Sequence, residues 1–278
     1  MKILYLSKMK YLKTNYLRVI VKILLFLLGF ILSTLGIAMY ISSTIGASQI
    51  DWTLYNISSI IGKYNFETGT MSDEVLKSTY ILALNILYII MVFFSFIFAL
   101  SPTIKEYKKI RKNEIWFNLL IIIISDIIIA FLTPLLLNFY FKNVIILDKI
   151  MSDKITQEIR NWIFIAGFTI FCFGIALWVH SGIIMGPFNN ICYQLMRLTN
   201  MNYLKSRVII DFCIFFPGIV FWFFIPGNWN QRLLFLTKNF GIGTIAFTFI
   251  AGPYINMFLN FIKKCIKYFK INQVNKNI

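Results

Sequence analysis

One carboxylate in the middle of a long apolar run is the first residue in this sequence that could carry chemistry. Asp126 lies in the segment IIIISDIIIAFLTP, with no basic residue within two helical turns on either side. A carboxylate at the centre of a bilayer costs about 2.5–3.5 kcal/mol, so it must face a cavity or a partner, or be protonated. Asp126 is therefore a candidate cation or proton site. The alternative is a purely structural hydrogen bond to a neighbouring helix, through Ser125 or a threonine.

Further polar residues lie near the ends or interruptions of apolar segments. Arg207 and Asp211 are four residues apart, a spacing that forms a local ion pair on a helix. This pair is either a snorkelling anchor for the helix or a gate that clamps a solute. Asp51 precedes an amphipathic stretch, where it is the natural N-cap of a helix. The other candidates for a substrate or ion site are Asn189, Asn190, Asn256, Gly252 and Pro253.

The pair Gly252-Pro253 interrupts the last apolar segment. A proline inside a helix frees a backbone carbonyl, and such interruptions within a membrane often form binding sites. Thr244, Thr248 and Asn256 belong to the same segment and could line a polar path beside the interruption.

Sequence signatures of common enzymes are missing from this chain. It contains no Walker A loop, no GxSxG, no HExxH and no haem attachment motif. Four cysteines show no paired spacing, so neither a disulfide framework nor a metal site is predicted. We therefore expect no catalytic residues, no metal, no cofactor and no enzymatic activity.

The elements that must position these residues are membrane-spanning helices. Apolar residues make up 59% of the 278 residues and charged residues only 14%, and several apolar runs are long enough to cross a bilayer. The predicted class is an all-α membrane protein. Its six transmembrane helices are predicted at Val19–Tyr40, Thr79–Leu100, Ile115–Tyr140, Trp162–Val179, Val208–Ile225 and Phe240–Ile262.

The sequence contains an internal repeat. Residues 29–43, GFILSTLGIAMYISS, reappear at 167–181 as GFTIFCFGIALWVHS, with matched glycines at Gly29/Gly167 and Gly36/Gly174. Such self-similarity predicts two copies of one ancestral unit. Because each copy has three spans, an odd number, the second copy must enter the membrane from the opposite side. We therefore predict two inverted three-helix repeats, an arrangement that many carriers use to build a central site.

The predicted organisation follows from these repeats. It comprises a basic cytoplasmic N-terminal segment (1–18), a first repeat (19–141), an external connection (142–161), a second repeat (162–262) and a basic cytoplasmic tail (263–278). Each repeat also holds a short amphipathic stretch after its first span, around Ile50–Ile61 and Phe188–Leu198. These stretches are too short to span. They are either interfacial helices or re-entrant half-helices whose N-termini approach the midplane.

The net charge of +16 is concentrated at the ends of the apolar segments. Most lysines and arginines fall on the side that holds both termini, which the positive-inside rule assigns to the cytoplasm. This distribution argues against nucleic-acid binding and for contact with anionic lipid headgroups.

Several motifs resemble those of YczE-like bacterial membrane proteins, which are distant relatives of the YitT group. The resembling elements are Gly36-Ile-Ala with Gly46-Ala-Ser-Gln-Ile-Asp51, Pro187-Phe-Asn189, Leu204-Lys-Ser-Arg207 with Asp211, and Gly241-Ile-Gly-Thr244 with Ile250-Ala-Gly-Pro253. The sequence departs from the family where Gln49-Ile50 replaces a Pro-Trp and Asn189 replaces an acid. The resemblance implies a fold and a multi-pass location in a bacterial cell membrane. It implies no substrate.

Together these features predict a secondary carrier or facilitator of a small solute or ion, with a site between the repeats. The alternatives are a non-transporting accessory or assembly subunit, or a substrate-binding subunit of an ATP-driven vitamin importer. The expected partners are the lipid bilayer and an unidentified small solute or ion. A further copy of the chain or another membrane protein remains open as a partner, and nucleic acid is not expected.

Overall fold

The computed structural model describes residues 16–43, 45, 48–61, 73–144 and 156–275, and over these residues it is built of helices without strands. The helices are α2 (Tyr16–Ser43), α3 (Gln49–Ile61), α4 (Asp73–Ile110), α5 (Glu114–Asn143), α7 (Gln157–Ser181), α8 (Gly186–Thr199), α9 (Tyr203–Phe224), α10 (Trp229–Asn239), α11 (Ile242–Ile245), the π-helical segment η1 (Ala246–Ile250) and α12 (Ala251–Asn275). Most of the basic segment predicted at 1–18, and the middle of the external connection predicted at 142–161, lie outside the described residues.

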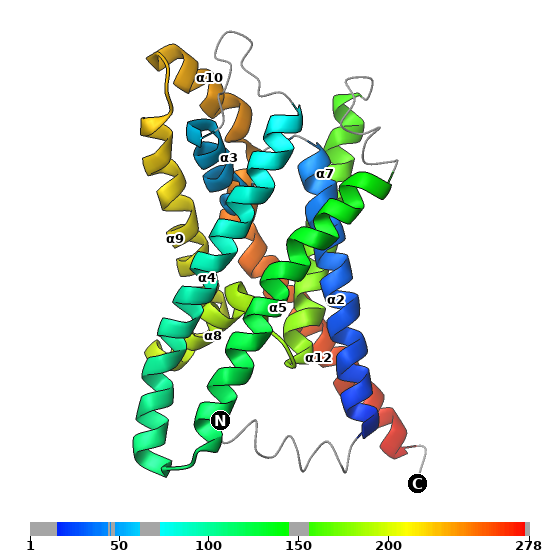
Figure 1. The fold of residues 1–278 in the computed structure, drawn as a ribbon. Coiled ribbons are helices and arrows are strands. Elements are labelled where there is room, and N and C mark those ends of the chain that lie inside the picture. The colour runs from blue at the N-terminus through cyan, green and yellow to red at the C-terminus, as the bar shows by residue number, and fades with distance from the viewer. Residues whose placement is uncertain (1–15, 44, 46–47, 62–72, 145–155, 276–278) are drawn as a thin grey trace.

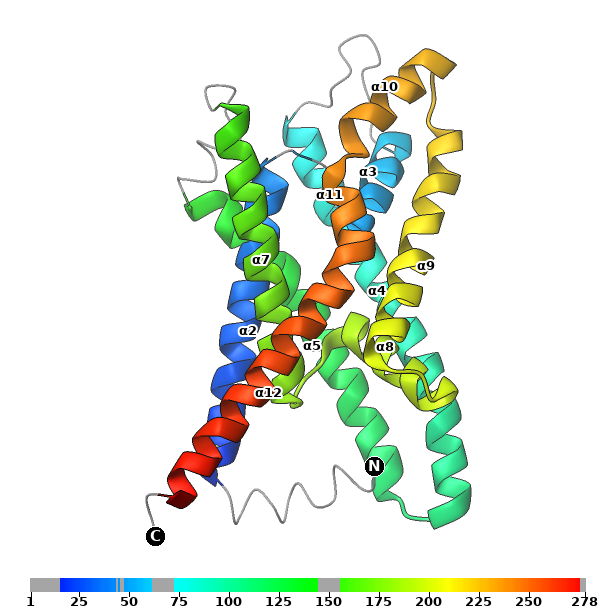
Figure 2. The same cartoon turned by 180° about the vertical axis from the view of Figure 1, so that it is seen from behind.

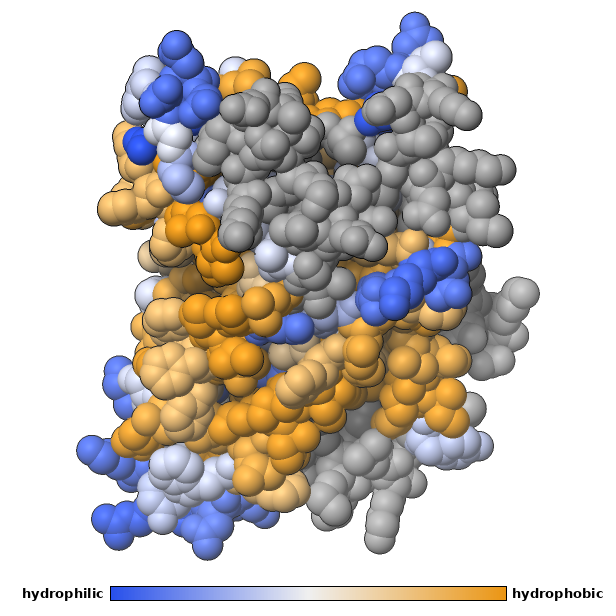
Figure 3. Space-filling view, turned by 45° about the horizontal axis from the view of Figure 1, so that its top comes forward, coloured by the Kyte–Doolittle hydropathy of each residue, from blue (hydrophilic) through white to orange (hydrophobic). Residues whose placement is uncertain are grey.

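Six helical stretches are long and apolar enough to cross a membrane, which confirms the predicted all-α class and its six spans. They are Val19–Ser43, Leu82–Ile110, Glu114–Asn143, Gln157–Ser181, Tyr203–Phe223 and Ile242–Cys265. Their outer faces carry large exposed apolar side chains, such as Phe131 and Leu135 on α5. Much of the visible face is accordingly hydrophobic in Figure 3, and many hydrophilic atoms lie at its ends. Only lipid can cover such a surface at low cost, so this is a multi-pass membrane protein.

Helices α2 and α7, the first helices of the two predicted repeats, pack closely along their lengths (Figure 1). A Cβ atom on Gly29 would lie 2.7 Å from the carbonyl oxygen of Gly174, and one on Gly36 would lie 2.7 Å from that of Gly167. Residue numbers rise along α2 as they fall along α7, so the two helices are antiparallel. Glycine at all four positions lets the two backbones approach each other.

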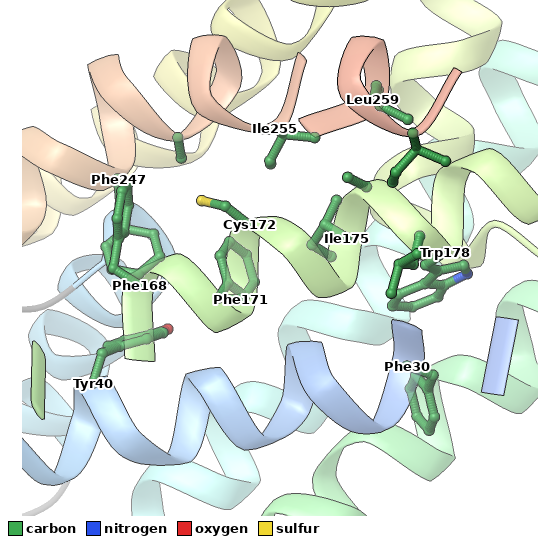
Figure 4. Close-up of a cluster of buried hydrophobic side chains, with 14 of the residues drawn as sticks. Phe30, Tyr40, Phe168, Phe171, Cys172, Ile175, Trp178, Phe247, Ile255 and Leu259 are labelled. Atoms are coloured by element: carbon green, nitrogen blue, oxygen red, sulfur yellow. The ribbon is translucent and has the colours of Figure 1, made fainter. Parts of the chain in front are cut away.

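Aromatic side chains fill the space between this helix pair and the last span. Figure 4 shows Phe168 and Phe171 of α7 near Phe247 of η1 and Tyr40 of α2. The Phe247 ring centroid lies 4.4 Å from that of Tyr40 and 4.9 Å from that of Phe168. Phe247 is 1% exposed and therefore anchors the last span against α2 and α7.

The two short amphipathic stretches form α3 and α8, and both lie inside the helix bundle (Figures 1 and 2). Helix α3 packs on α9 of the second predicted repeat, and α8 packs on α4 of the first. Thr53 of α3 donates a hydrogen bond to the Ile214 carbonyl, near the middle of α9. Asn190 of α8 reaches Asp126, near the middle of α5. Polar side chains such as Asn56 on α3 and Asn189 on α8 are buried, so these helices do not turn a wholly polar face to solvent.

The last span differs from a regular helix where the sequence predicts an interruption. Residues 246–250 form a π-helical turn immediately before Gly252-Pro253, so the helix widens and continues instead of breaking. The turn accommodates the missing N–H of Pro253. The sequence analysis also did not anticipate α10, a short helix between α9 and α11. Asn228 and Gln231 form a capping box at its start.

Candidate functional site

A small cavity lies between the two predicted repeats. It has a volume of about 40 Å³, which is room for a few water molecules or a small ion. Both halves of the chain line it, and its polar lining comprises Tyr40, Ser48, Asp51, Tyr88, Thr133 and Arg207. Apolar side chains that include Phe171 and Phe247 complete the wall. One acidic and one guanidinium side chain, both buried, therefore line the same cavity.

Asp51 is held at the start of α3. Tyr40 of α2 donates a hydrogen bond of 2.8 Å to its Oδ2 atom, and the Ser48 hydroxyl donates one of 2.6 Å to the same oxygen. The backbone N–H of Asp51 donates in return to Ser48 Oγ at 3.2 Å. The Ser48 backbone N–H donates to Asp51 Oδ2 at 3.1 Å, so Ser48 is the N-cap of a capping box and Asp51 is its N3 residue. This corrects the prediction that Asp51 is itself the cap.

Asp51 lies in a poorly solvated position among hydroxyl groups. The Asp51 side chain is 1% exposed. Burial and the nearby Asp51 carboxylate raise the pKa of the Tyr55 phenol well above its usual value, so this hydroxyl stays protonated. Neutral hydroxyl donors therefore stabilise the acid from α2 and the α3 N-terminus.

Arg207 lies on α9, where it lines the cavity from the second half of the chain. Its Nε atom donates to Asp211 Oδ2 at 3.2 Å, and its NH1 atom donates to Asn189 Oδ1 of α8 at 3.3 Å. The Phe188 ring centroid lies 3.8 Å from its guanidinium carbon, within cation–π range. Arg207 and Asp211 are both buried, so this pair is not a snorkelling anchor at the membrane surface.

Asp126 lies outside the cavity in a polar cluster of its own. Ser95 of α4 donates a hydrogen bond of 2.5 Å to Asp126 Oδ2, and the Asn190 side-chain amide donates to Oδ1. The Ser125 hydroxyl bonds to the Ile122 carbonyl of its own helix. Ser95 and Asn190 therefore bind the Asp126 carboxylate in place of the hydrogen bond expected through Ser125.

The remaining candidates occupy different environments on α12. Gly252 is buried against Arg207, and a Cβ there would lie 3.5 Å from Arg207 Cγ, which is ordinary contact. Pro253 is exposed on the outer surface, so it does not line the cavity. Asn256 is half-buried and is not among the cavity-lining residues. The Thr248 hydroxyl donates a hydrogen bond to the Thr244 carbonyl, so this bond stays within the last span.

Several lining residues were not singled out by the sequence analysis. Tyr88 and Thr133 lie in the interiors of apolar spans, where single polar groups have no local pattern. A signal existed for Ser48, because Ser-x-x-Asp from 48 to 51 is a capping-box sequence. Among the described residues, no group of three or more His, Cys, Asp or Glu side chains is placed to hold a metal ion.

Comparison with known proteins assigns the chain to a family. The model of a family of unknown function, DUF6198, matches residues 20–260, which include the cavity-lining residues and nearly all of the six spans. The chain belongs to this family. No curated protein and no solved structure matches the chain. The DUF6198 assignment therefore covers the site without naming an activity for it.

Proposed function

We propose that this DUF6198 protein is a secondary carrier or facilitator of a small polar solute or ion. The observation that carries the proposal is the cavity between the halves, which is lined by Asp51 from one and by Arg207 from the other. The role requires no enzymatic chemistry. A solute bound there contacts both halves, so relative movement of the halves exposes it to either side.

The cost of burying these groups supports a functional role. Asp51 is 1% exposed and Arg207 is 2% exposed, within a bundle whose outer face is apolar. Ionisable groups at such depth are expensive to insert and commonly mark substrate or ion pathways. A carboxyl group and a guanidinium in the lining of one cavity suit a solute that carries a cationic or hydrogen-bonding group together with an anionic one.

The helix arrangement supports inverted repeats. An axis that relates α2 to α7 exchanges Gly29 with Gly167 and Gly36 with Gly174. It therefore exchanges the two observed glycine contacts with each other. The same axis exchanges the packing of α3 on α9 with that of α8 on α4. This pattern is what two oppositely inserted copies require.

The cellular setting follows from charge and resemblance. We infer a bacterial cell membrane with both termini in the cytoplasm, because basic residues concentrate on that side. The YczE-like motifs support the same location. One of them, Ile250-Ala-Gly-Pro253, brings Gly252 against Arg207, which gives that motif a packing role beside the cavity.

A thermal-stability screen tests the proposal. Purified protein would be heated with amino acids, organic cations, small carboxylates and inorganic salts, one at a time. Solutes that bind the folded state raise the melting temperature. We expect at least one stabilising solute with the unaltered chain, and loss of that effect in Asp51→Asn. Glu158→Gln, which neutralises an exposed acid at the start of α7, is the matched control and should keep the effect. Retention of full stabilisation in Asp51→Asn would contradict the site.

One observation favours a non-transporting accessory subunit as the second candidate. Both carboxylate oxygens of Asp126 are already hydrogen bonded by protein groups, as a static structural role requires. If the protein is an accessory subunit, no solute should stabilise the purified chain. A partner membrane protein should stabilise it instead.

A further inference from the structure

Asp126 is a buried acid that the cavity does not use. It is 1% exposed, and its hydrogen bonds come from two neutral donors, Ser95 on α4 and Asn190 on α8. Among the described residues, no lysine, arginine or histidine forms an ion pair with it. A charge without a counter-ion at this depth is costly, so a proton is readily taken up.

The Ser95 hydroxyl can serve both protonation states of this acid. A serine hydroxyl both donates and accepts. It now lies 2.5 Å from Asp126 Oδ2. When Asp126 is ionised, Ser95 donates to Oδ2. When Oδ2 takes a proton from a hydronium ion and leaves a water molecule, the carboxylic acid donates and the Ser95 oxygen accepts. Ser95 can therefore stay hydrogen bonded to Oδ2 in either state, which favours reversible binding.

The Asn190 amide, in contrast, responds to the protonation state. Its Nδ2 atom donates to Oδ1 and cannot accept in return. Hydrogen bonds to an ionised group are roughly twice as strong as those between neutral groups. The link between α8 and α5 is therefore stronger when Asp126 is ionised and weaker when it is protonated.

Helix α8 connects this acid to the cavity. Asn189, next to Asn190, accepts a hydrogen bond of 3.3 Å from NH1 of Arg207, which lines the cavity. On α5, Asp126 lies seven residues before the cavity residue Thr133, about 10 Å along the helix. A change at Asp126 therefore reaches Arg207 through two adjacent asparagines.

We propose that Asp126 is a reversible proton-binding site, and that α8 couples its protonation to Arg207 at the cavity. The coupling rests on the proposed carrier function, but the proton site does not. Helices α4, α8 and α2 pack on α5. In their described parts, they offer Asp126 no titratable or charged group as a hydrogen-bond or ion-pair partner. The charged groups connected to it are Arg207 and Asp211, through α8.

The chemistry around Asp126 fits a proton better than a metal cation. Its oxygens receive hydrogen bonds from a hydroxyl and an amide N–H, and a bound cation would need a shell of oxygen ligands instead. Sodium ions at constant pH are therefore expected to leave the site unchanged.

Infrared difference spectroscopy during a pH titration, from about pH 4 to about pH 9, tests the proton site. We expect the unaltered chain to show the band of a buried protonated carboxyl that appears as the pH falls. This band should be missing in Asp126→Asn and kept in Glu114→Gln, which removes an exposed acid on the same helix. A titrating band that persists in Asp126→Asn, or a carboxyl that does not titrate over the range, would overturn the proposal. A band that follows sodium at constant pH would also overturn it.

Hydrogen exchange in α8 tests the coupling. After correction for intrinsic rates, amides of residues 186–199 should exchange roughly fivefold faster at low pH than at high pH. In the Asn190→Ala variant, the α8 amides should exchange fast at both pH values while the Asp126 carboxyl still titrates. This variant tests the coupling even if Asp126→Asn does not fold. If the corrected exchange rates of the α8 amides in the unaltered chain do not depend on pH, the coupling is contradicted. Neither experiment uses a solute, so a titrating Asp126 in a chain that binds no solute would refute the carrier function alone.

Discussion

Gly36 of α2 lies so close to Phe171 of α7 that a Cβ atom on Gly36 would be 2.5 Å from the Phe171 backbone nitrogen. No side chain can move aside to relieve that contact, because backbone atoms form it. The glycines of the repeated segment therefore set the spacing between the two halves of the molecule.

Gly36→Ala should lower stability for this reason. The two helices must separate, and overpacking of this kind costs about 1–3 kcal/mol. Thermal unfolding of the purified protein in detergent would show the loss as a lower melting temperature. Gly252→Ala is the matched control, because its Cβ meets Arg207 Cγ at an ordinary 3.5 Å. Equal melting temperatures for the two variants would show that α2 and α7 do not pack as described.

The buried ion pair gives a second stability prediction. Arg207→Met leaves the Asp211 carboxylate buried without its guanidinium, which costs about 3–5 kcal/mol. Replacing both residues, with Asp211→Leu added, should recover most of that loss, because no charge then remains to be paired. Melting temperatures of the single and double variants measure the difference.

An exposed ion pair serves as the control for this comparison. Arg197 and Glu106 approach to 2.9 Å with side chains that are 30% and 38% exposed. Glu106→Gln should therefore cost only about 0–1 kcal/mol. If Arg207→Met were as mild as Glu106→Gln, the Arg207–Asp211 pair would have to be solvated.

Cysteine labelling tests whether α8 lies inside the bundle. Cys192 is 0% exposed, and burial raises the pKa of its thiol to about 12. Only the thiolate reacts, so raising the pH to about 9 still leaves roughly one thiol in a thousand ionised. A water-soluble maleimide should label Cys265, which is partly exposed, and spare Cys192 until the protein is unfolded in SDS. Mass spectrometry identifies the labelled sites. Rapid labelling of Cys192 in the folded protein would place α8 at the surface.

The distribution of basic residues predicts the orientation. The positive-inside rule places both termini in the cytoplasm, so a green fluorescent protein fused after residue 278 should fluoresce and alkaline phosphatase fused there should be inactive. The same reporters placed between residues 145 and 155 should give the opposite result. An active C-terminal phosphatase would reverse the assignment of the two sides.

The six spans were predictable from their long apolar runs, because a segment that crosses a bilayer must itself be long and apolar. The positions of α3 and α8 were not predictable in this way. Asn56 on α3 and Gln194 on α8 indicate solvated faces by local pattern, yet both are fully buried because helices of the other half cover them. Helix α10, in contrast, begins with the local capping box of Asn228 and Gln231, a signal that lies in the sequence itself.

The same distinction holds for the site. Asp126 was identifiable because a single acid in an apolar run is conspicuous. Its partner Ser95 is 31 residues away, and its partner Asn190 is 64 residues away. The cavity likewise depends on Asp51 and Arg207 coming together from different halves. Packing between helices decides these contacts, and no periodicity in either segment encodes them.

Uptake into proteoliposomes tests the central claim most directly, that the cavity between Asp51 and Arg207 binds the carried solute. The solute that stabilises the purified protein would be supplied outside vesicles that contain the unaltered chain, Asp51→Asn or Glu158→Gln. We predict uptake by the unaltered chain and Glu158→Gln, and a loss of at least about tenfold in Asp51→Asn, the factor that corresponds to one lost charge-assisted hydrogen bond. Uptake by Asp51→Asn at the rate of the unaltered chain would contradict the account.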